Sequence, residues 1–292
     1  MSRADIESPL LTTITAPHGA RSNDSFSAIA GVARVGRTSD AETTFAMNAV
    51  LSNAKAELSP ELQARVEATR ALLLRAIQDF GDVVYSNSLG AEAMALTDII
   101  WSSGLPIDIF SIDTGRLHEE TYSLLDRIQR RYGKHIELFY PDAANLERYV
   151  RQHGINGFYN SLDERLSCCH IRKIEPFRRA VAGRKAWVTG VRRQQSSARA
   201  HAEAVEWDTA NGLYKVSPLL EWTAQDVWTY ITVHQLPYNP LHDKQYPSIG
   251  CAPCTRAVEA GQDNRSGRWW WENPDSRECG LHPRIRAITQ GA

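Results

Sequence analysis

The sequence has no run of eighteen or more apolar residues, so it predicts no membrane-spanning helix. Its first residues lack the compact apolar core of a secretory signal peptide, and they carry too many acidic residues for an organelle transit peptide. Net charge is also nearly absent, at −1, and by itself indicates no particular partner. We therefore expect a cytoplasmic protein that binds neither a membrane nor a nucleic acid.

Cysteine is scarce, with five residues in the chain. In a reducing compartment, such cysteines are more typical of metal ligands or catalytic thiols than of disulfides. Four of them form two pairs, Cys168-Cys169 and Cys251-Ala-Pro-Cys254, whereas Cys279 stands alone. A four-ligand metal site would use both pairs and leave Cys279 as the free thiol, which makes it the candidate nucleophile.

The two cysteine pairs do not by themselves identify a metal. Zinc and iron–sulfur clusters both accept four thiolates. Adjacent cysteines are unusual for tetrahedral zinc, in which the first two ligands are normally about two to four residues apart, and this favours a cluster. The alternative is a set of inert buried thiols, which would make the two pairs a coincidence.

Strand-like and helix-like patterns alternate from residue 82 onward. The expected strands lie at 83–86, 107–111, 136–140 and 186–189, and the expected helices at 60–80, 90–101 and 117–132. Ser59 and Pro60 are typical of an N-cap and a first helical position, and they mark where the folded part begins. Strands separated by helices predict an α/β fold, with a parallel twisted sheet and helices on both faces.

The later part of the chain changes character. Asn211-Gly212 between two short apolar runs predicts a hairpin, and Thr223 to Asp226 predicts the start of a further helix that ends near residue 235. Beyond Pro240 the chain is rich in Pro, Gly and Cys without a clear period. We expect a mobile extension at 1–58, an α/β domain at 59–240 and an irregular, cluster-binding and catalytic segment at 241–292.

Three loops follow predicted strands, at the edge where open parallel sheets bind ligands. Each loop alone could be an ordinary Ser- or Gly-containing turn, but their equivalent positions favour a shared site. The candidate binding residues in them are Ser86, Ser88, Gly90, Asp113, Thr114, Gly115, Gly190, Arg192 and Arg199.

Basic residues are concentrated between Arg172 and Arg193, where eight stand against one acid, Glu175. This suggests an anionic ligand such as phosphate or sulfate, and the alternative is a solvated basic helix face. Arg265 and Arg268 lie shortly before Cys279, and the guanidinium group fits phosphate or sulfate oxygens. The adjoining run of three tryptophans is interpreted as packing rather than as a lid.

Cys279 needs help to react, because a free thiol with a pKa of about 8.5 is mostly protonated near neutral pH. His282 and nearby arginines are the candidates to lower that pKa. Attack on a sulfur surrounded by anionic oxygens also meets repulsion, about 4 kcal/mol per unit-charge pair at ~4 Å and an effective dielectric of about 20. Lys173, Arg265 and Arg268 would offset this repulsion if the fold brings them together.

These patterns together resemble the assimilatory adenylyl-sulfate reductases, iron–sulfur members of the APS/PAPS reductase family. They comprise the two cysteine pairs, Ser86-x-Ser-x-Gly-Ala-Glu92, Asp113-Thr-Gly-Arg-Leu117, Gly190-x-Arg192-Arg193, Arg265-x-Gly-Arg-Trp-Trp-Trp-Glu272 and Glu278-Cys-Gly-Leu-His282. The resemblance runs from about residue 60 to the end of the chain. Gln194 departs from it, because an acidic residue is common at this position of the Arg192 loop in the family.

The resemblance implies an adenine nucleotide alpha-hydrolase-like fold and the reduction of adenosine 5′-phosphosulfate in sulfate assimilation and cysteine biosynthesis. It implies a 4Fe–4S cluster on the two cysteine pairs and attack by Cys279 on the sulfate sulfur, which expels AMP and leaves an S-sulfocysteine. A thiol of thioredoxin, or of glutaredoxin or glutathione, then releases sulfite. It places phosphosulfate contacts on Lys173, Arg199, Arg265 and Arg268, and nucleotide contacts on the loops at 86–90 and 113–115.

One feature of this scheme also follows from the residues. If four cysteines are held on iron, Cys279 has no resolving partner in its own chain, so turnover requires an outside thiol.

We expect a homo-oligomer. The alternatives are a reductase of 3′-phosphoadenylyl sulfate, an ATP-splitting enzyme on a similar sheet, and a non-catalytic iron–sulfur or zinc redox sensor. The loop at 86–90 departs from the Ser-Gly-Gly-x-Asp-Ser loop of ATP-splitting enzymes.

Overall fold

The computed structural model describes residues 57–195, 199–273, 277 and 281. Helix α2 (Pro60–Phe80) opens the described part of the chain, and the hydroxyl of its N-cap residue, Ser59, accepts from the backbone N–H of Leu62. The predicted helix at 60–80 is therefore confirmed, with its cap. The predicted extension at 1–58 lies outside the described residues except for its last two.

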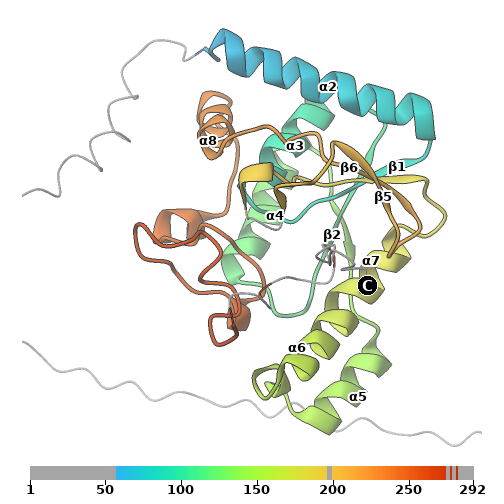
Figure 1. Ribbon diagram of the computed structural model, residues 1–292, viewed down its shortest axis with the longest axis vertical. Helices are drawn as coiled ribbons and strands as arrows, with labels where there is room; N and C mark the ends of the chain where they lie inside the picture. The colour runs from blue at the N-terminus through green and yellow to red at the C-terminus, as the bar shows by residue number, and fades with distance from the viewer. Residues whose placement is uncertain (1–56, 196–198, 274–276, 278–280, 282–292) are drawn as a thin grey trace, which may run out of the picture. The chain divides into compact units, whose positions relative to one another are not determined.

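Six strands form one sheet in the order β3-β2-β1-β4-β6-β5 (Figure 1). Their bounds are β1 (Val83–Ser86), β2 (Asp108–Ile112), β3 (Glu137–Phe139), β4 (Ala186–Val188), β5 (Val205–Asp208) and β6 (Leu213–Val216). Strand β1 pairs in parallel with β2 and β4, and among these six strands only β5 runs antiparallel, beside β6. The predicted parallel sheet is confirmed, and the predicted hairpin forms one of its edges.

The strand order reverses at β1, because the chain builds β2 and β3 on one side of it and then returns to add β4 on the other. Loops that leave the carboxyl ends of β1 and β4 therefore turn away from each other. In open α/β sheets the crevice between such loops is the usual ligand site. The topology thus places two loops that are far apart in the sequence on the two sides of one crevice.

Helices cover both faces of the sheet, as predicted. They include α3 (Ala91–Ser102), α4 (Glu119–Tyr132), α7 (Glu175–Ala180) and α8 (Ala224–Val233). Val83 and Tyr85 of β1 pack in one core with α2, α3, α4 and α8, whereas Val84 between them packs in a second core with Phe177 of α7. This alternation is the period of a strand with two buried faces.

Three helices between β3 and β4 were not predicted from the sequence patterns. These are α5 (Ala143–His153), α6 (Leu162–Cys169) and α7, and α6 runs into a π-helical turn, η2 (His170–Ile174). Single π-helical turns are rare and occur frequently at functional sites. The turn η2 carries Arg172 and Lys173 directly after the adjacent cysteines.

The described chain beyond residue 240 is irregular, in agreement with the sequence. It contains the short 3₁₀ helices η5 (Pro240–Lys244) and η6 (Ala252–Cys254) and an isolated bridge between Thr255 and Arg268. The division into domains at 59–240 and 241–292 stays a prediction. Among the described helices, none is both long and apolar enough to span a membrane.

Candidate active site

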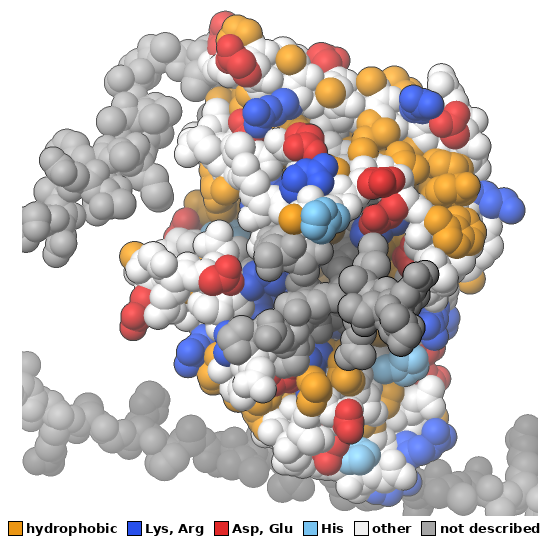
Figure 2. Space-filling view, in the orientation of Figure 1, with side chains coloured by type: hydrophobic (Ala, Val, Ile, Leu, Met, Phe, Trp, Pro, Cys, Tyr) orange, Lys and Arg blue, Asp and Glu red, His pale blue; other side chains and the backbone are white. Residues whose placement is uncertain are grey.

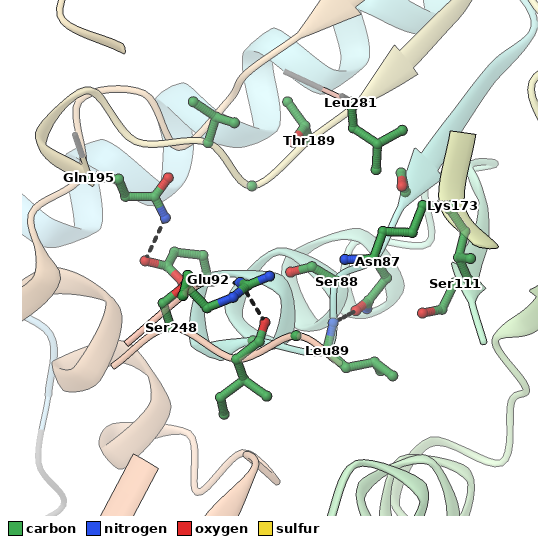
Figure 3. A pocket seen from close by; sticks show the side chains of 18 of the residues that line it. Asn87, Ser88, Leu89, Glu92, Ser111, Lys173, Thr189, Gln195, Ser248 and Leu281 are labelled. Atoms are coloured by element: carbon green, nitrogen blue, oxygen red, sulfur yellow. Dashed lines mark hydrogen bonds between the residues drawn. The ribbon is translucent and has the colours of Figure 1, made fainter. Parts of the chain in front are cut away.

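A cavity of about 250 Å³ lies at the carboxyl ends of β1, β2 and β4 (Figure 3). Loops after all three strands line it, together with parts of the segment beyond residue 240. The predicted site residues that line it are Ser86, Ser88, Gly90, Thr114, Lys173, Gly190, Arg192, Arg199, Cys251, Arg265 and Arg268. Residues that the sequence could assign only to separate strand ends therefore share one cavity.

The loop after β1 is held by Asn87, a residue that the sequence analysis did not select. Its side-chain oxygen accepts from the backbone N–H of Leu89 at 2.6 Å (Figure 3), and its Nδ2 donates to Thr97 Oγ1 at 2.7 Å. These bonds hold Leu89 at a positive φ of 59° and leave Gly90 as the N-cap of α3. The loop thereby presents the two serines and the first turn of a helix to the cavity, an arrangement that suits an anion.

In the loop after β2, one predicted site residue stabilises the turn and another lines the cavity. Asp113 Oδ1 accepts from the backbone N–H of Gly115 at 2.7 Å and from the Tyr122 hydroxyl at 2.9 Å, so this carboxylate shapes the turn. Neither Asp113 nor Gly115 lines the cavity, and their predicted contact with a substrate stays a prediction. Thr114 does line it, and its Oγ1 lies 3.3 Å from Cys251 Sγ.

The loop after β4 is tied to helix α3 through Glu92. Gln195 Nε2 donates to Glu92 Oε1 at 2.9 Å (Figure 3). Arg192 Nε donates to the same oxygen at 2.8 Å, and Arg199 donates to Gln195. Glu92 and Gln195 line the cavity but were not among the predicted site residues, because their pairing spans about one hundred residues of sequence. Gln194, the departure from the family pattern, is exposed beside this network.

Lys173, Arg265 and Arg268 line the cavity together with Cys251. Arg268 Nη1 donates to Ser248 Oγ and to the Ile249 carbonyl, each at 3.3 Å. The guanidinium passes so close to Gly250 that a Cβ there would lie 2.2 Å from Arg268 Nη2, so a side chain at that position would displace the guanidinium. The fold therefore brings Lys173, Arg265 and Arg268 to one cavity.

Several residues of the basic run at 172–193 form ion pairs on the protein surface or beside the sheet. Arg179 pairs with Glu175, Arg184 with Asp82 and Asp108, and Arg193 with Glu221. Of the eight basic residues, Lys173 and Arg192 line the cavity. On the face seen in Figure 2, basic and acidic side chains of the described residues are interspersed. Two members of the run thus lie at the cavity, and the expectation that the run marks an anion site stays a prediction.

The four paired cysteines lie in one buried cluster with exposed fractions of 7–8%. They are free thiols, and Trp269, Phe158 and Tyr149 pack around them. Burial of Trp269 also confirms that this tryptophan is a packing residue. In the described part of the chain, no three His, Cys, Asp or Glu side chains are arranged to hold a metal ion.

Positive groups are directed at these thiols. Burial raises the pKa of Cys254 to about 12 and that of Cys169 to about 11. Burial also acts to raise the pKa of Cys251, but Lys173, the Thr114 hydrogen bond and two arginines outweigh it and bring that pKa below its usual value. Trp269 Nε1, buried in the same cluster, has no hydrogen-bond partner within the described residues. Such surroundings suit a group held by several thiolates.

Cys279 and His282 lie outside the described residues, so the geometry of the candidate nucleophile and its helper is not described. Two residues close to Cys279 in the sequence are described. Leu281 lines the cavity (Figure 3), and the carbonyl of Arg277 accepts from Arg265 Nη2 at 3.4 Å.

His242 also lines the cavity and was missed by the sequence analysis. Its Nε2 is buried and has no hydrogen-bond partner among the described groups, and burial lowers its pKa. A neutral imidazole at the cavity wall offers one donor or acceptor to a ligand. Its only sequence signal was a histidine in a turn of the irregular segment.

The chain matches known proteins over most of its length. Residues 82–257 match the family model described as phosphoadenosine phosphosulfate reductase domain. Among curated relatives, an adenosine 5′-phosphosulfate reductase of Burkholderia cepacia is 53% identical over 80% of this chain and 92% of its own. A second, from Agrobacterium fabrum, is 42% identical over 72% of this chain and 84% of its own.

The fold has a counterpart among solved structures. A phosphoadenylyl-sulfate reductase from Candida auris, solved as a phosphate complex, superimposes with a TM-score of 0.57 at 26% identity. The match covers 69% of this chain and 98% of the other.

Proposed function

This chain belongs to the phosphoadenosine phosphosulfate reductase family, and on that premise we propose that it reduces adenosine 5′-phosphosulfate to sulfite and AMP in sulfate assimilation. The observation that carries the proposal is the convergence on one cavity of the β1 and β4 loops, three basic side chains and Leu281. In this proposal the β1 and β4 loops bind the nucleotide, and the basic side chains bind its anionic groups. Leu281 belongs to the Glu278-Cys-Gly-Leu-His282 motif. Relatives at 42–53% identity named for this nucleotide support it over the 3′-phosphorylated one.

Cys279 is the nucleophile in this proposal. Its thiolate attacks the sulfate sulfur, a new S–S bond forms, the S–O bond to the phosphate breaks, and AMP leaves with the electron pair. Lys173, Arg265 and Arg268, three basic side chains of the cavity wall, reduce the repulsion between thiolate and sulfonate. Ser86, Ser88 and the N-terminus of α3 hold the nucleotide phosphate, and His282 lowers the pKa of the thiol.

An outside dithiol completes the cycle. One thiolate of thioredoxin attacks Cys279 Sγ, expels sulfite and forms a mixed disulfide, which the second thiol resolves. Cys279 is thereby released as a thiol, and two electrons pass from the dithiol to the sulfonyl sulfur. Glutaredoxin serves in the same way, or two molecules of glutathione, of which the second resolves the mixed disulfide. We further propose that the protein acts in the cytoplasm as a homo-oligomer.

Cys168, Cys169, Cys251 and Cys254 would hold a 4Fe–4S cluster. Each thiolate of such a cluster binds a different iron, so the ligands need not converge on a single ion. Four free, buried thiols in one cluster, faced by basic groups and an unsatisfied indole N–H, fit this donor set. When bound, the group supplies fixed charge beside the cavity, where it would order Lys173 and the loop around Cys251.

Replacement of Cys279 by Ser tests the proposal. The variant should form no sulfite while it retains its iron content and its affinity for AMP. Undiminished sulfite formation would exclude the mechanism, and sulfite formation that strongly prefers the 3′-phosphorylated nucleotide in the unaltered protein would overturn the substrate.

A further inference from the structure

A buried ion pair connects helix α6 with the segment that leads to Cys279. Arg165 Nε and Nη2 donate to the two carboxylate oxygens of Glu272, each at 2.7 Å. The side chains are 1% and 7% exposed. A two-point contact of this kind fixes the orientation of both partners, because each guanidinium N–H faces one oxygen. Helix α6 ends at Cys168 and Cys169, so the pair joins the thiol cluster to the later chain.

Arg277 continues the connection. Its Nε and Nη2 donate to the Glu272 carbonyl at 3.0 and 2.8 Å, and the same guanidinium donates to the carbonyls of Trp270 and Ser266 at 3.2 and 3.4 Å. One side chain thus joins three carbonyls of the loop that carries Arg265 and Arg268. In return, the Arg277 carbonyl accepts from Arg265, which lines the cavity.

Resting on the proposed function, we propose that Arg165, Glu272 and Arg277 are positioning residues that hold the entry to the Cys279 segment against the cavity. Arg165 fixes the carboxylate of Glu272, the Glu272 carbonyl receives Arg277, and Arg277 stands two residues before the nucleophile. None of the three lines the cavity, so they act through the segment and not on the substrate.

The expected effect is on the rate of attack and not on nucleotide binding. A misplacement of reacting groups by about 1 Å can cost roughly 10²-fold in rate. Glu272→Gln and Arg277→Ala should therefore each slow the S-sulfonation of Cys279 about 10- to 100-fold at saturating adenylyl sulfate without added thiol. Affinity for AMP and the iron content should stay as in the unaltered protein, and Arg277→Lys should recover part of the rate.

The decisive comparison is with the double variant that combines Glu272→Gln and Arg277→Ala. If the two residues act through one connection, the combined change should slow S-sulfonation no more than the slower single variant does. If the rate reductions of the two single variants instead multiply in the double variant, the two residues do not act through one connection and the proposal is overturned. Unchanged rates in both single variants would also overturn it, as would a loss of AMP affinity equal to the loss of rate.

Two controls keep the test specific. Glu175→Gln makes the same chemical change in an exposed ion pair on α7, with Arg179, and should leave the rate unchanged. If Glu272→Gln unfolds, the comparison of Arg277→Ala with Arg277→Lys decides, and equal rates in those two variants would overturn the proposal. Absence of S-sulfonation in the unaltered protein would instead refute the proposed function itself.

Discussion

Replacement of Lys173 by Met removes one of the positive charges at the cavity while it keeps an unbranched side chain. Lys173 lines the cavity, lies 5.8 Å from the Trp269 ring centroid, and is the largest influence that lowers the pKa of Cys251. If its ammonium group meets the sulfonate, the contact is a charge-assisted hydrogen bond worth about 1.5–3 kcal/mol. A full unit-charge interaction at ~4 Å and an effective dielectric of about 20 sets an upper value of about 4 kcal/mol.

These limits correspond to a loss in kcat/KM of about 10- to 10³-fold, with roughly 10²-fold as the central expectation. The assay measures sulfite formation from adenylyl sulfate and, separately, inhibition by AMP. Because AMP lacks the sulfonyl group, its inhibition constant should change less than about threefold. Lys173→Arg keeps the charge and should retain more activity than Lys173→Met.

A matched control is Lys244→Met, because Lys244 is 61% exposed, pairs with Glu120 and does not line the cavity. This variant should match the unaltered protein. The reasoning about Lys173 is refuted if Lys173→Met keeps full kcat/KM. An equal loss of affinity for AMP would instead show that the ammonium group holds the nucleotide phosphate.

Two further outcomes follow from the described geometry. Asp98→Ala should lower the free energy of unfolding by about 3 kcal/mol in a denaturant titration, because the Tyr132 and Tyr230 hydroxyls that donate to this carboxylate at 2.8 and 2.9 Å would lose their acceptor; no change would contradict this. In reduced protein stripped of iron, a small alkylating agent should modify Cys251 at lower pH than Cys254, whose pKa is raised to about 12. Peptide mapping over a pH series checks this order, and the reverse order would contradict it.

Local signals in the sequence were sufficient for most of the sheet and several helices. Ser59-Pro60 marked the start of α2, and Asn211-Gly212 marked the hairpin, where Gly212 has a positive φ of 71°. Apolar strands between helices then implied parallel pairing. These features depend on contacts within a few residues, which a single sequence records directly.

Features that depend on distant partners were not predictable in the same way. Helix α5 buries Tyr149, and α6 buries Arg165 and two cysteines, so few apolar residues mark the buried faces of these helices. Helix α7 packs on the sheet but has six residues, too few for a repeating apolar pattern. The roles of Asn87, Glu92 and Gln195 depend on hydrogen bonds that only the folded chain creates. The Arg165–Glu272 pair spans 107 positions, and no local pattern announces it.

The central claim is that Cys279 becomes sulfonated, and mass spectrometry of intact and digested protein tests it most directly. The iron-loaded protein is mixed with adenylyl sulfate in the absence of any thiol and then digested. We predict an added SO₃ on the peptide that contains Cys279, with release of AMP in equal amount and loss of the adduct when reduced thioredoxin is added. An unmodified Cys279 peptide, or SO₃ on a different cysteine, would contradict the account.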